Sequence, residues 1–167
     1  MAKRNFLVEG GSGCGKSSVY RELRRRGIPA IDGDNELAYK GDPHTGEPVE
    51  NPTFWHHIWD VDRVLALAAD RSADVLFFCG GSRNVHRFIT VFDEVFVLDI
   101  DAATLARRLE ARDPDDWGGN DAQKAFILKL HETRGAVPAG TIIDTDRPIE
   151  AVVDAILARV AVAGVAI

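Results

Sequence analysis

A glycine-rich stretch near the start of the chain carries the residue types that hold phosphate groups. Residues 10–17 read Gly-Gly-Ser-Gly-Cys-Gly-Lys-Ser, with Gly10, Gly15, Lys16 and Ser17 at the fixed positions of the P-loop pattern G-x-x-x-x-G-K-[ST]. Its glycines and N–H groups wrap the phosphates, the lysine reaches the terminal phosphates, and the serine hydroxyl ligates Mg²⁺. The pattern therefore predicts binding of ATP with Mg²⁺. The predicted nucleotide-binding residues are Gly11, Ser12, Gly13, Cys14, Gly15, Lys16, Ser17 and Ser18.

A second unusual stretch, Phe54-Trp-His-His-Ile-Trp59, holds two tryptophans and two histidines in six residues. Aromatic side chains can stack on a base or ring, so Trp55 and His57 are candidate substrate-binding residues. The helical spacing of the apolar residues that follow favours core packing for Trp59. Residues 38–59, rich in Pro, Gly and His, are expected to form a flap over an acceptor.

The two cysteines, Cys14 and Cys79, stand far apart in different contexts, so neither a disulfide framework nor a metal cluster is indicated. Cys14 lies inside the phosphate loop, where a helix N-terminus could favour its thiolate and make it prone to oxidation. This is a hypothesis, and full activity after exhaustive alkylation of the thiol would reject it.

Short apolar runs alternate with helical stretches along the chain. The runs lie at 6–8, 28–31, 75–79, 95–98 and 141–143, and the helical stretches at 17–26, 55–70, 84–91, 102–112, 121–134 and 148–163. Each run is continuously apolar, as strands covered on both faces are. The alternation predicts an α/β fold with a three-layer, doubly wound parallel sheet of five strands. The glycine pattern follows the first strand and opens the first helix, which is the context it requires.

Length and composition indicate one soluble domain over residues 1–167, with 46% hydrophobic and 28% charged residues. The net charge of −6 argues against nucleic acid as the main partner, because phosphate backbones need a basic face. No signal peptide precedes the first strand, and no run approaches about 18 apolar residues. A cytoplasmic monomer or homodimer without membrane contact is expected.

Over nearly its whole length the chain resembles the small-molecule P-loop kinases of the adenylate kinase, shikimate kinase and nucleoside kinase group, within the AAA-type ATP-binding proteins. Asp32-Gly-Asp34 resembles the D-x-D of shikimate kinases. The resemblance implies that Asp32 helps to hold Mg²⁺ through water and that Asp34 meets the acceptor hydroxyl. A carboxylate suits that position, because phosphoryl transfer needs an aligned nucleophile and a group that accepts its proton. An Asx turn that caps a helix is the alternative.

The segment Cys79-Gly-Gly-Ser-Arg83-Asn84 resembles the glycine-rich segment beneath the substrate in shikimate kinases. This implies that Gly80 and Gly81 make room for substrate and that Arg83 pairs with one of its groups; a surface arginine after a tight turn is the alternative. The strand before this segment lacks the acidic residue that usually ends a Walker B strand, so Asp32 takes the Mg²⁺ role instead.

Arg108-Leu-Glu-Ala-Arg112 resembles the R-x-x-x-R before the lid of adenylate kinases, with two guanidiniums on one helical face. By that resemblance Arg108 stacks on adenine, Arg112 contacts phosphates, and residues 113–121 form a lid that excludes water. Arg134 is a further candidate for neutralising charge during transfer. The alternative for each arginine is a solvated helix face.

The residues after the last predicted strand resemble the segment that flanks adenine in nucleotide kinases. Asp146 and Pro148 then belong to a base-binding loop. A helix start, with Asp146 as its cap and Pro148 in its first turn, is compatible with the same residues.

The leading functional hypothesis is transfer of the γ-phosphoryl group of ATP to a hydroxyl of a small molecule: a nucleoside, sugar, cyclic alcohol or antibiotic. A nucleoside monophosphate kinase ranks second, because the acceptor region lacks a dense arginine cluster for a second set of phosphates. The rival from another class is an ATP-binding regulatory or assembly factor without an acceptor. ATP turnover that depends strictly on an added acceptor distinguishes the two classes.

Overall fold

A parallel sheet forms the middle layer of the computed structural model, which describes residues 3–162. The strand order is β2-β5-β1-β6-β7. The strands are β1 (Arg4–Gly10), β2 (Ala30–Asp32), β5 (Val75–Cys79), β6 (Glu94–Asp99) and β7 (Thr141–Asp144). All four pairings between them are parallel. The prediction of a doubly wound five-stranded α/β sheet is therefore confirmed.

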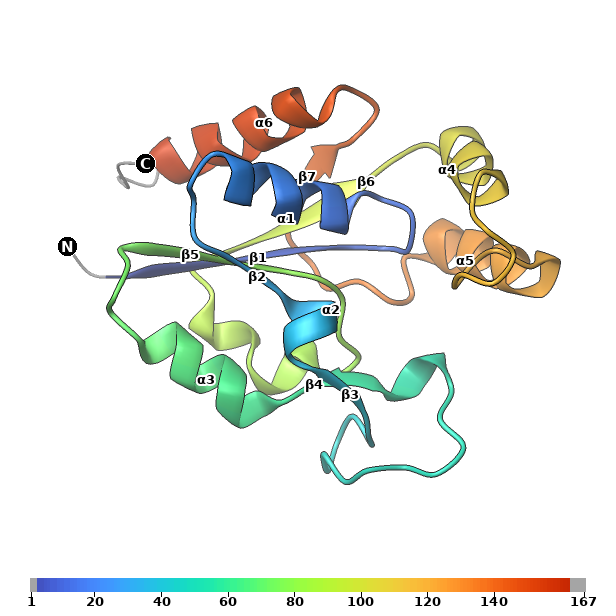
Figure 1. Cartoon of the computed structure of the whole chain (residues 1–167), viewed down its shortest axis with the longest axis horizontal. Helices are drawn as coiled ribbons and strands as arrows, with labels where there is room; N and C mark the ends of the chain where they lie inside the picture. The colour runs from blue at the N-terminus through green and yellow to red at the C-terminus, as the bar shows by residue number, and fades with distance from the viewer. Residues whose placement is uncertain (1–2, 163–167) are drawn as a thin grey trace.

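Helices cover both faces of this sheet (Figure 1). The helices α1 (Lys16–Arg25) and α6 (Ile149–Val162) lie on one face, and α3 (Val61–Ala69) lies on the other. The helices α4 (Ala102–Glu110) and α5 (Asp121–Thr133) stand beyond the carboxyl ends of the strands. The predicted end of the last helix at residue 163 lies outside the described residues.

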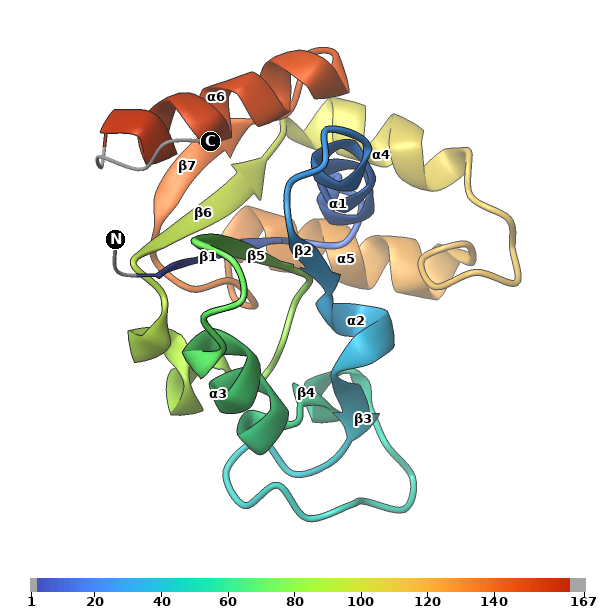
Figure 2. The ribbon, with the colours of Figure 1, turned by 60° about the vertical axis from the view of Figure 1, so that its left-hand side comes forward.

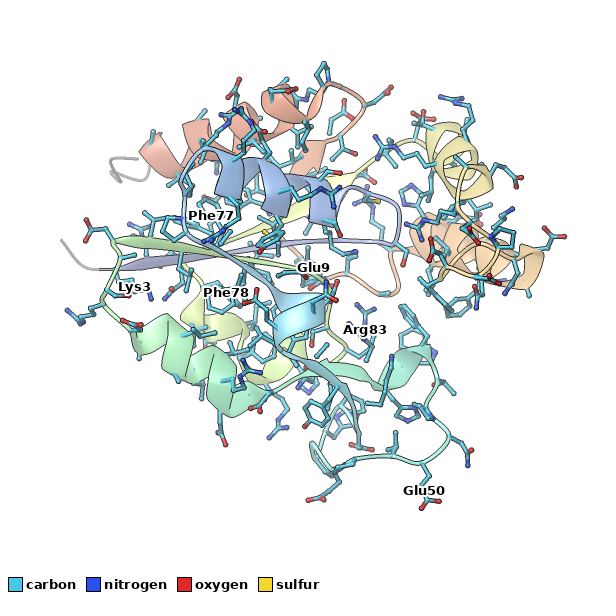
Figure 3. The ribbon with its side chains drawn as sticks, in the orientation of Figure 1. Lys3, Glu9, Glu50, Phe77, Phe78 and Arg83 are labelled. Atoms are coloured by element: carbon cyan, nitrogen blue, oxygen red, sulfur yellow. The ribbon has the colours of Figure 1, made fainter. Side chains whose placement is uncertain are left out.

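The sheet separates two apolar cores, which explains why its strands are apolar on both sides. Phe77 belongs to the core under α1 and α6, whereas its neighbour Phe78 belongs to the core under α3. Figure 3 shows the two rings on opposite faces of β5. Both are fully buried. The strands are thereby fixed in register, and their carboxyl ends meet at one edge.

A small two-stranded ribbon stands apart from the main sheet, below α2 (Gly33–Glu36) in Figure 2. Its strands are β3 (Ala38–Lys40) and β4 (His57–Trp59), which pair antiparallel. The predicted helix at 55–70 is wrong over its first six residues: residues 54–56 form a 3₁₀ turn, β4 follows, and helix begins only at Val61. Asp60 explains that start, because its carboxylate caps α3 by accepting from the N–H of Arg63 at 3.1 Å.

The predicted helix at 84–91 is also wrong, since two 3₁₀ turns occupy 85–87 and 89–91. Phe88 separates them with a φ of −141°, which is outside the helical region. Its ring is buried against Trp59, with the centroids 5.8 Å apart. Packing of this one residue has overridden the helical pattern. No helix within residues 3–162 is long and apolar enough to cross a membrane.

Candidate active site

The glycine loop lies at the carboxyl edge of the sheet, where β1 passes directly into α1. Gly15 precedes α1 with a φ of +104°, a conformation that L side chains rarely adopt. The Lys16 ammonium donates to the carbonyl oxygens of Gly10 at 2.6 Å and Gly11 at 3.2 Å. Burial lowers the pKa of Lys16, and the nearby carboxylates of Asp34 and Glu9 oppose that shift. The loop thus holds a buried cation at the edge where parallel sheets bind ligands.

A cavity of about 580 Å³ lies against the outer side of the loop. Its wall includes residues 12–18 and the predicted Arg108 and Arg112. Arg108 donates to the Gly13 carbonyl at 3.0 Å and to the Thr145 carbonyl at 3.1 Å, so it joins the loop to the segment after β7. We call this space the nucleotide cavity.

The predicted base-binding loop borders the nucleotide cavity through neighbouring residues. Asp146 and Pro148 are both exposed, whereas Thr145, Arg147 and Ile149 line the wall. The segment therefore borders the cavity, but neither Asp146 nor Pro148 lines it, and base binding by this loop stays a prediction.

A second cavity of about 580 Å³ lies on the other side of the loop, and we call it the acceptor cavity. The predicted residues that line it are Gly11, Ser12, Lys16, Asp34, His57, Gly81, Arg83 and Arg134. Arg134 is half exposed and pairs with Asp99 at 2.8 Å. Phe54, Ile127 and Leu130 contribute apolar wall. The flap residues and the strand ends therefore enclose one space.

Two other predicted substrate residues lie beside this cavity rather than in its wall. Trp55 is 46% exposed and packs edge-on against Phe54, with the centroids 5.1 Å apart. Gly80 has a φ of +146°, and a Cβ there would come within 2.9 Å of Asp34 and 2.8 Å of Trp59. Glycine at this position lets those two side chains meet. Trp59 itself is fully buried, as the core interpretation predicted.

The two cavities meet at the glycine loop. Their walls share Ser12, Lys16, Asp34 and Trp117. Trp117 was not singled out from the sequence, although it lies in the segment 113–121 that was predicted to be a lid. Its indole N–H donates to the Ser12 hydroxyl at 3.1 Å, and its ring stacks on Phe54 at 5.9 Å. One side chain of this segment thus reaches both the loop and the flap.

Asp34 is the carboxylate on the shared wall. Its Oδ1 accepts from His57 Nε2 at 2.9 Å, from the Gly81 N–H at 3.2 Å and from the Trp59 indole N–H at 3.4 Å. Burial acts to raise the pKa of Asp34, but the His57 hydrogen bond and the Lys16 charge outweigh it and hold this pKa below its usual value. Asp34 is therefore ionised at neutral pH and can accept a hydrogen bond from a ligand.

Sequence reasoning missed a buried contact between Glu9 and Arg83 behind the acceptor cavity. Glu9, at the end of β1, is 1% exposed, and its Oε1 lies 3.3 Å from Arg83 Nη2 (Figure 3). Burial raises the pKa of Glu9 to about 8, against the opposing charges of Arg83 and Lys16. Arg83 also donates to the Ala136 carbonyl at 2.7 Å and lies over the Phe54 ring at 4.8 Å. An acidic residue directly after the apolar run 6–8 was the signal that could have found it.

The predicted Mg²⁺ residues offer oxygen donors, which this ion prefers. Ser17 is exposed in the first turn of α1 and lines the nucleotide cavity. Asp32 ends β2, where its Oδ1 accepts from the Asn35 N–H at 3.3 Å and its Oδ2 from the Asn35 side chain at 2.7 Å. Hydroxyl and carboxylate oxygens keep lone pairs after one such bond, so the donor types suit Mg²⁺, although Asp32 lines neither cavity. The alternative interpretation of Asp32, a helix cap, is also observed.

The environment of Cys14 contradicts the hypothesis of a reactive thiol. The side chain is 1% exposed and belongs to the core under α1. Burial raises the pKa of its thiol, more than the Lys16 charge lowers it. Burial of the sulfur thus outweighs the helix N-terminus, and the prediction of a favoured thiolate is wrong.

Residues 7–125 match a family of AAA domains, AAA_18. No curated protein sequence matches the chain. Similar solved structures include a sugar kinase from Janibacter sp. HTCC2649, with 18% identity, 93% of each chain covered and a TM-score of 0.57. A shikimate kinase from Bacteroides thetaiotaomicron has 16% identity and a TM-score of 0.57, covering 94% of this chain and 98% of that one.

A gluconokinase from Sinorhizobium meliloti 1021 is similar at 20% identity, with a TM-score of 0.52 over 94% of this chain and 93% of that one. At such identities the likeness shows a shared fold, and it agrees with the parallel sheet and helices described above.

Proposed function

The chain belongs to the AAA domain family AAA_18, and we propose that it is a small-molecule kinase, which transfers the γ-phosphoryl group of ATP to a hydroxyl of its acceptor. In this proposal residues 38–59 are the acceptor flap and residues 113–121 the lid of a single domain. The kinases among the similar structures, titled sugar kinase, shikimate kinase and gluconokinase, support the reaction class.

The observation that carries the proposal is the shared wall of the two cavities. A triphosphate in the nucleotide cavity would direct its terminal phosphate toward Lys16, which also faces the acceptor cavity. Asp34 stands on the same wall. A nucleophile entering from the acceptor side would therefore meet the γ-phosphorus with a cation and a carboxylate beside it, as transfer requires.

Each residue has a role in the reaction as proposed. Asp34 orients the acceptor hydroxyl and takes its proton while the acceptor oxygen bonds to the γ-phosphorus. The bond from that phosphorus to the β–γ bridging oxygen breaks, and ADP leaves with the electron pair. Lys16 stabilises the negative charge that develops on the transferred group, and Arg112 and Arg134 add positive charge at the two cavity walls. Bound Mg²⁺, held by Ser17 and Asp32, would neutralise phosphate charge.

The acceptor cavity favours a hydroxyl compound over a nucleotide. Its two arginines are already engaged: Arg83 with Glu9 and the Ala136 carbonyl, and Arg134 with Asp99. A second set of phosphates would compete with these partners. A nucleoside, sugar, cyclic alcohol or antibiotic needs only Asp34 and the aromatic wall.

The test is an acceptor screen with ATP and Mg²⁺ against pooled nucleosides, nucleotides, sugars, cyclitols and aminoglycoside-like compounds. Product mass and ADP release are followed together. We expect one acceptor class to gain a phosphoryl group, and Asp34→Asn to cut that turnover by about 100-fold or more while ATP still binds. ATP binding without acceptor-dependent ADP would reject the kinase and favour a regulatory ATP-binding protein.

A further inference from the structure

The ribbon of β3 and β4 brings side chains to Asp34 from outside the main sheet. In its register Lys40 lies opposite His57, and Ala38 opposite Trp59. His57 and Trp59 both hydrogen-bond to the same oxygen of Asp34, Oδ1. Trp59 is anchored by stacking on Phe88 in the core. The ribbon, which belongs to the flap, therefore contacts the carboxylate of Asp34.

The partners of His57 fix where its proton resides. Asp34 Oδ1 already accepts from the Gly81 N–H and the Trp59 indole N–H, so it is an acceptor, and the His57 Nε2 must carry the hydrogen that points to it. On the other side of the ring, the ammonium of Lys40 lies 3.4 Å from Nδ1 and can only donate. Nδ1 is therefore an acceptor. Both neighbours select the tautomer with its hydrogen on Nε2.

The two oxygens of Asp34 are consequently unequal. Oδ1 receives three N–H groups, from His57, Trp59 and Gly81. Within residues 3–162 no group donates to Oδ2. Three donors on one oxygen set the rotation of the carboxylate, and the other oxygen remains available to a ligand in the cavity.

We propose that His57 is a positioning residue for Asp34, held in its Nε2–H tautomer by Lys40, and not a ligand of the acceptor. This inference rests on the proposed function, in which Asp34 Oδ2 receives the proton of the acceptor hydroxyl. His57 acts through Oδ1: it keeps Oδ2 turned to the reacting hydroxyl. The sequence predicted that His57 binds substrate; in this proposal His57 contacts Asp34, and Asp34 contacts the substrate.

The kinetic test compares His57→Phe with His57→Gln, whose amide can still donate to Asp34. We expect His57→Phe to lower kcat by about 10-fold to 100-fold with little change in either KM, and His57→Gln to recover most of the loss. His86→Phe, an exposed histidine outside the flap, is the matched control and should retain wild-type rates. A raised acceptor KM with unchanged kcat would overturn the proposal, because it would make His57 a substrate ligand.

A double-variant cycle asks whether His57 acts through Asp34. On an Asp34→Asn background, His57→Phe should cost less than about 2-fold, since the group it positions is already gone. If the double variant instead lost the product of the two single-variant factors in kcat, the proposal would be overturned. Melting temperatures of the single variants separate lost positioning from lost fold.

A second readout needs no catalysis. Long-range ¹H–¹⁵N spectra of the whole protein report which nitrogen of His57 carries hydrogen. We expect hydrogen on Nε2 alone in the wild type. In Lys40→Met we expect Nε2 to keep its hydrogen, because Asp34 still accepts it, and Nδ1 to carry hydrogen in a larger share of the molecules. Hydrogen on Nδ1 in the wild type would overturn the inference even if the kinase is established. A wild type with the expected tautomer but no acceptor-dependent turnover would instead reject the proposed function.

Discussion

Two buried or paired glutamates show how one residue type acquires opposite acidities in the same molecule. Glu9 has no water to solvate its charge, so its pKa rises to about 8. Glu22 accepts hydrogen bonds from Arg25 and Arg26, which lower its pKa to about 2. Ordinary glutamate titrates near 4.5. The two residues must therefore make the stability of the fold depend on pH in different windows.

Glu9→Gln should change the pH dependence of stability between pH 4.5 and about 8. In that window the folded wild type binds the Glu9 proton and the unfolded chain has lost it, so wild-type stability falls as pH rises. Glutamine removes this loss and still offers an oxygen to Arg83. Urea denaturation at pH 5, 6, 7, 8, 9 and 10 should show the stability of the variant rising relative to the wild type up to about pH 8, and then a constant difference.

Glu22→Gln is the control for that experiment. Because the folded-state pKa of Glu22 is lowered, its contribution is complete above pH 4.5 and is lost only as pH falls toward 2. Its difference from the wild type should thus stay flat from pH 5 to 8. A flat difference for Glu9→Gln as well would mean that Glu9 is ionised in the fold.

The residues foreseen from the sequence are those whose role is local. Lys16 and Ser17 follow from an eight-residue pattern, and the structure gathers that pattern at one loop. Glu9 and Trp117 could not be foreseen in this way, because their partners are 74 and 105 residues away along the chain. The roles of all these residues in catalysis stay predictions.

Among the elements, the strands of the main sheet were predictable and the ribbon was not. Continuous apolar runs such as Val75–Cys79 have few alternatives once both faces must be covered. In contrast, the apolar residues near Ile58 and Trp59 fit a helix and a short strand equally well. Pairing with β3 and capping by Asp60 decided the outcome, and both are tertiary effects.

Gly33→Ala should displace the ribbon. A Cβ at Gly33 would come within 2.1 Å of the Trp59 ring, which is fully buried and cannot move without disturbing its stack on Phe88. We expect a loss of about 1–3 kcal/mol of stability and a lower kcat, because Trp59 also positions Asp34. Gly135→Ala, where a Cβ meets mainly the flexible Thr133 hydroxyl at 3.1 Å, is the matched control. Equal stabilities of the two variants would argue against this packing constraint.

Trp117 should couple the proposed lid to transfer. Trp117→Ala removes both its hydrogen bond to Ser12 and its stack on Phe54, so water should enter and be phosphorylated in place of the acceptor. The ratio of free phosphate to phosphorylated acceptor should rise. Trp117→Phe keeps an aromatic ring for Phe54 but loses the N–H. Its ratio of free phosphate to phosphorylated acceptor should lie between those of the wild type and Trp117→Ala. A ratio unchanged in both variants would remove Trp117 from the lid function.

At the scale of the whole molecule, the nucleotide cavity joins parts of the chain that are distant in sequence. Its wall takes residues 12–19 after β1, Arg108 of α4 and Arg112 just beyond it, and Thr145, Arg147, Ile149 and Val152 after β7. Arg108 already ties two of these parts together. A ligand in this cavity contacts the loop after the first strand, the last helix and the end of α4, so its binding energy must appear in the stability of the entire fold.

ATP with Mg²⁺ should therefore raise the melting temperature of the whole protein. At 100 times its Kd, a ligand that binds only the folded state adds about 2.7 kcal/mol, which corresponds to about 5–10 °C for a chain of this size. Lys16→Ala should lose most of the shift, because the buried ammonium that meets the phosphates is gone. Lys129→Ala, an exposed lysine on α5, should keep it. If ATP raised the melting temperature of Lys16→Ala as much as that of Lys129→Ala, the triphosphate would have to bind away from the glycine loop. The assignments of both cavities would then be wrong.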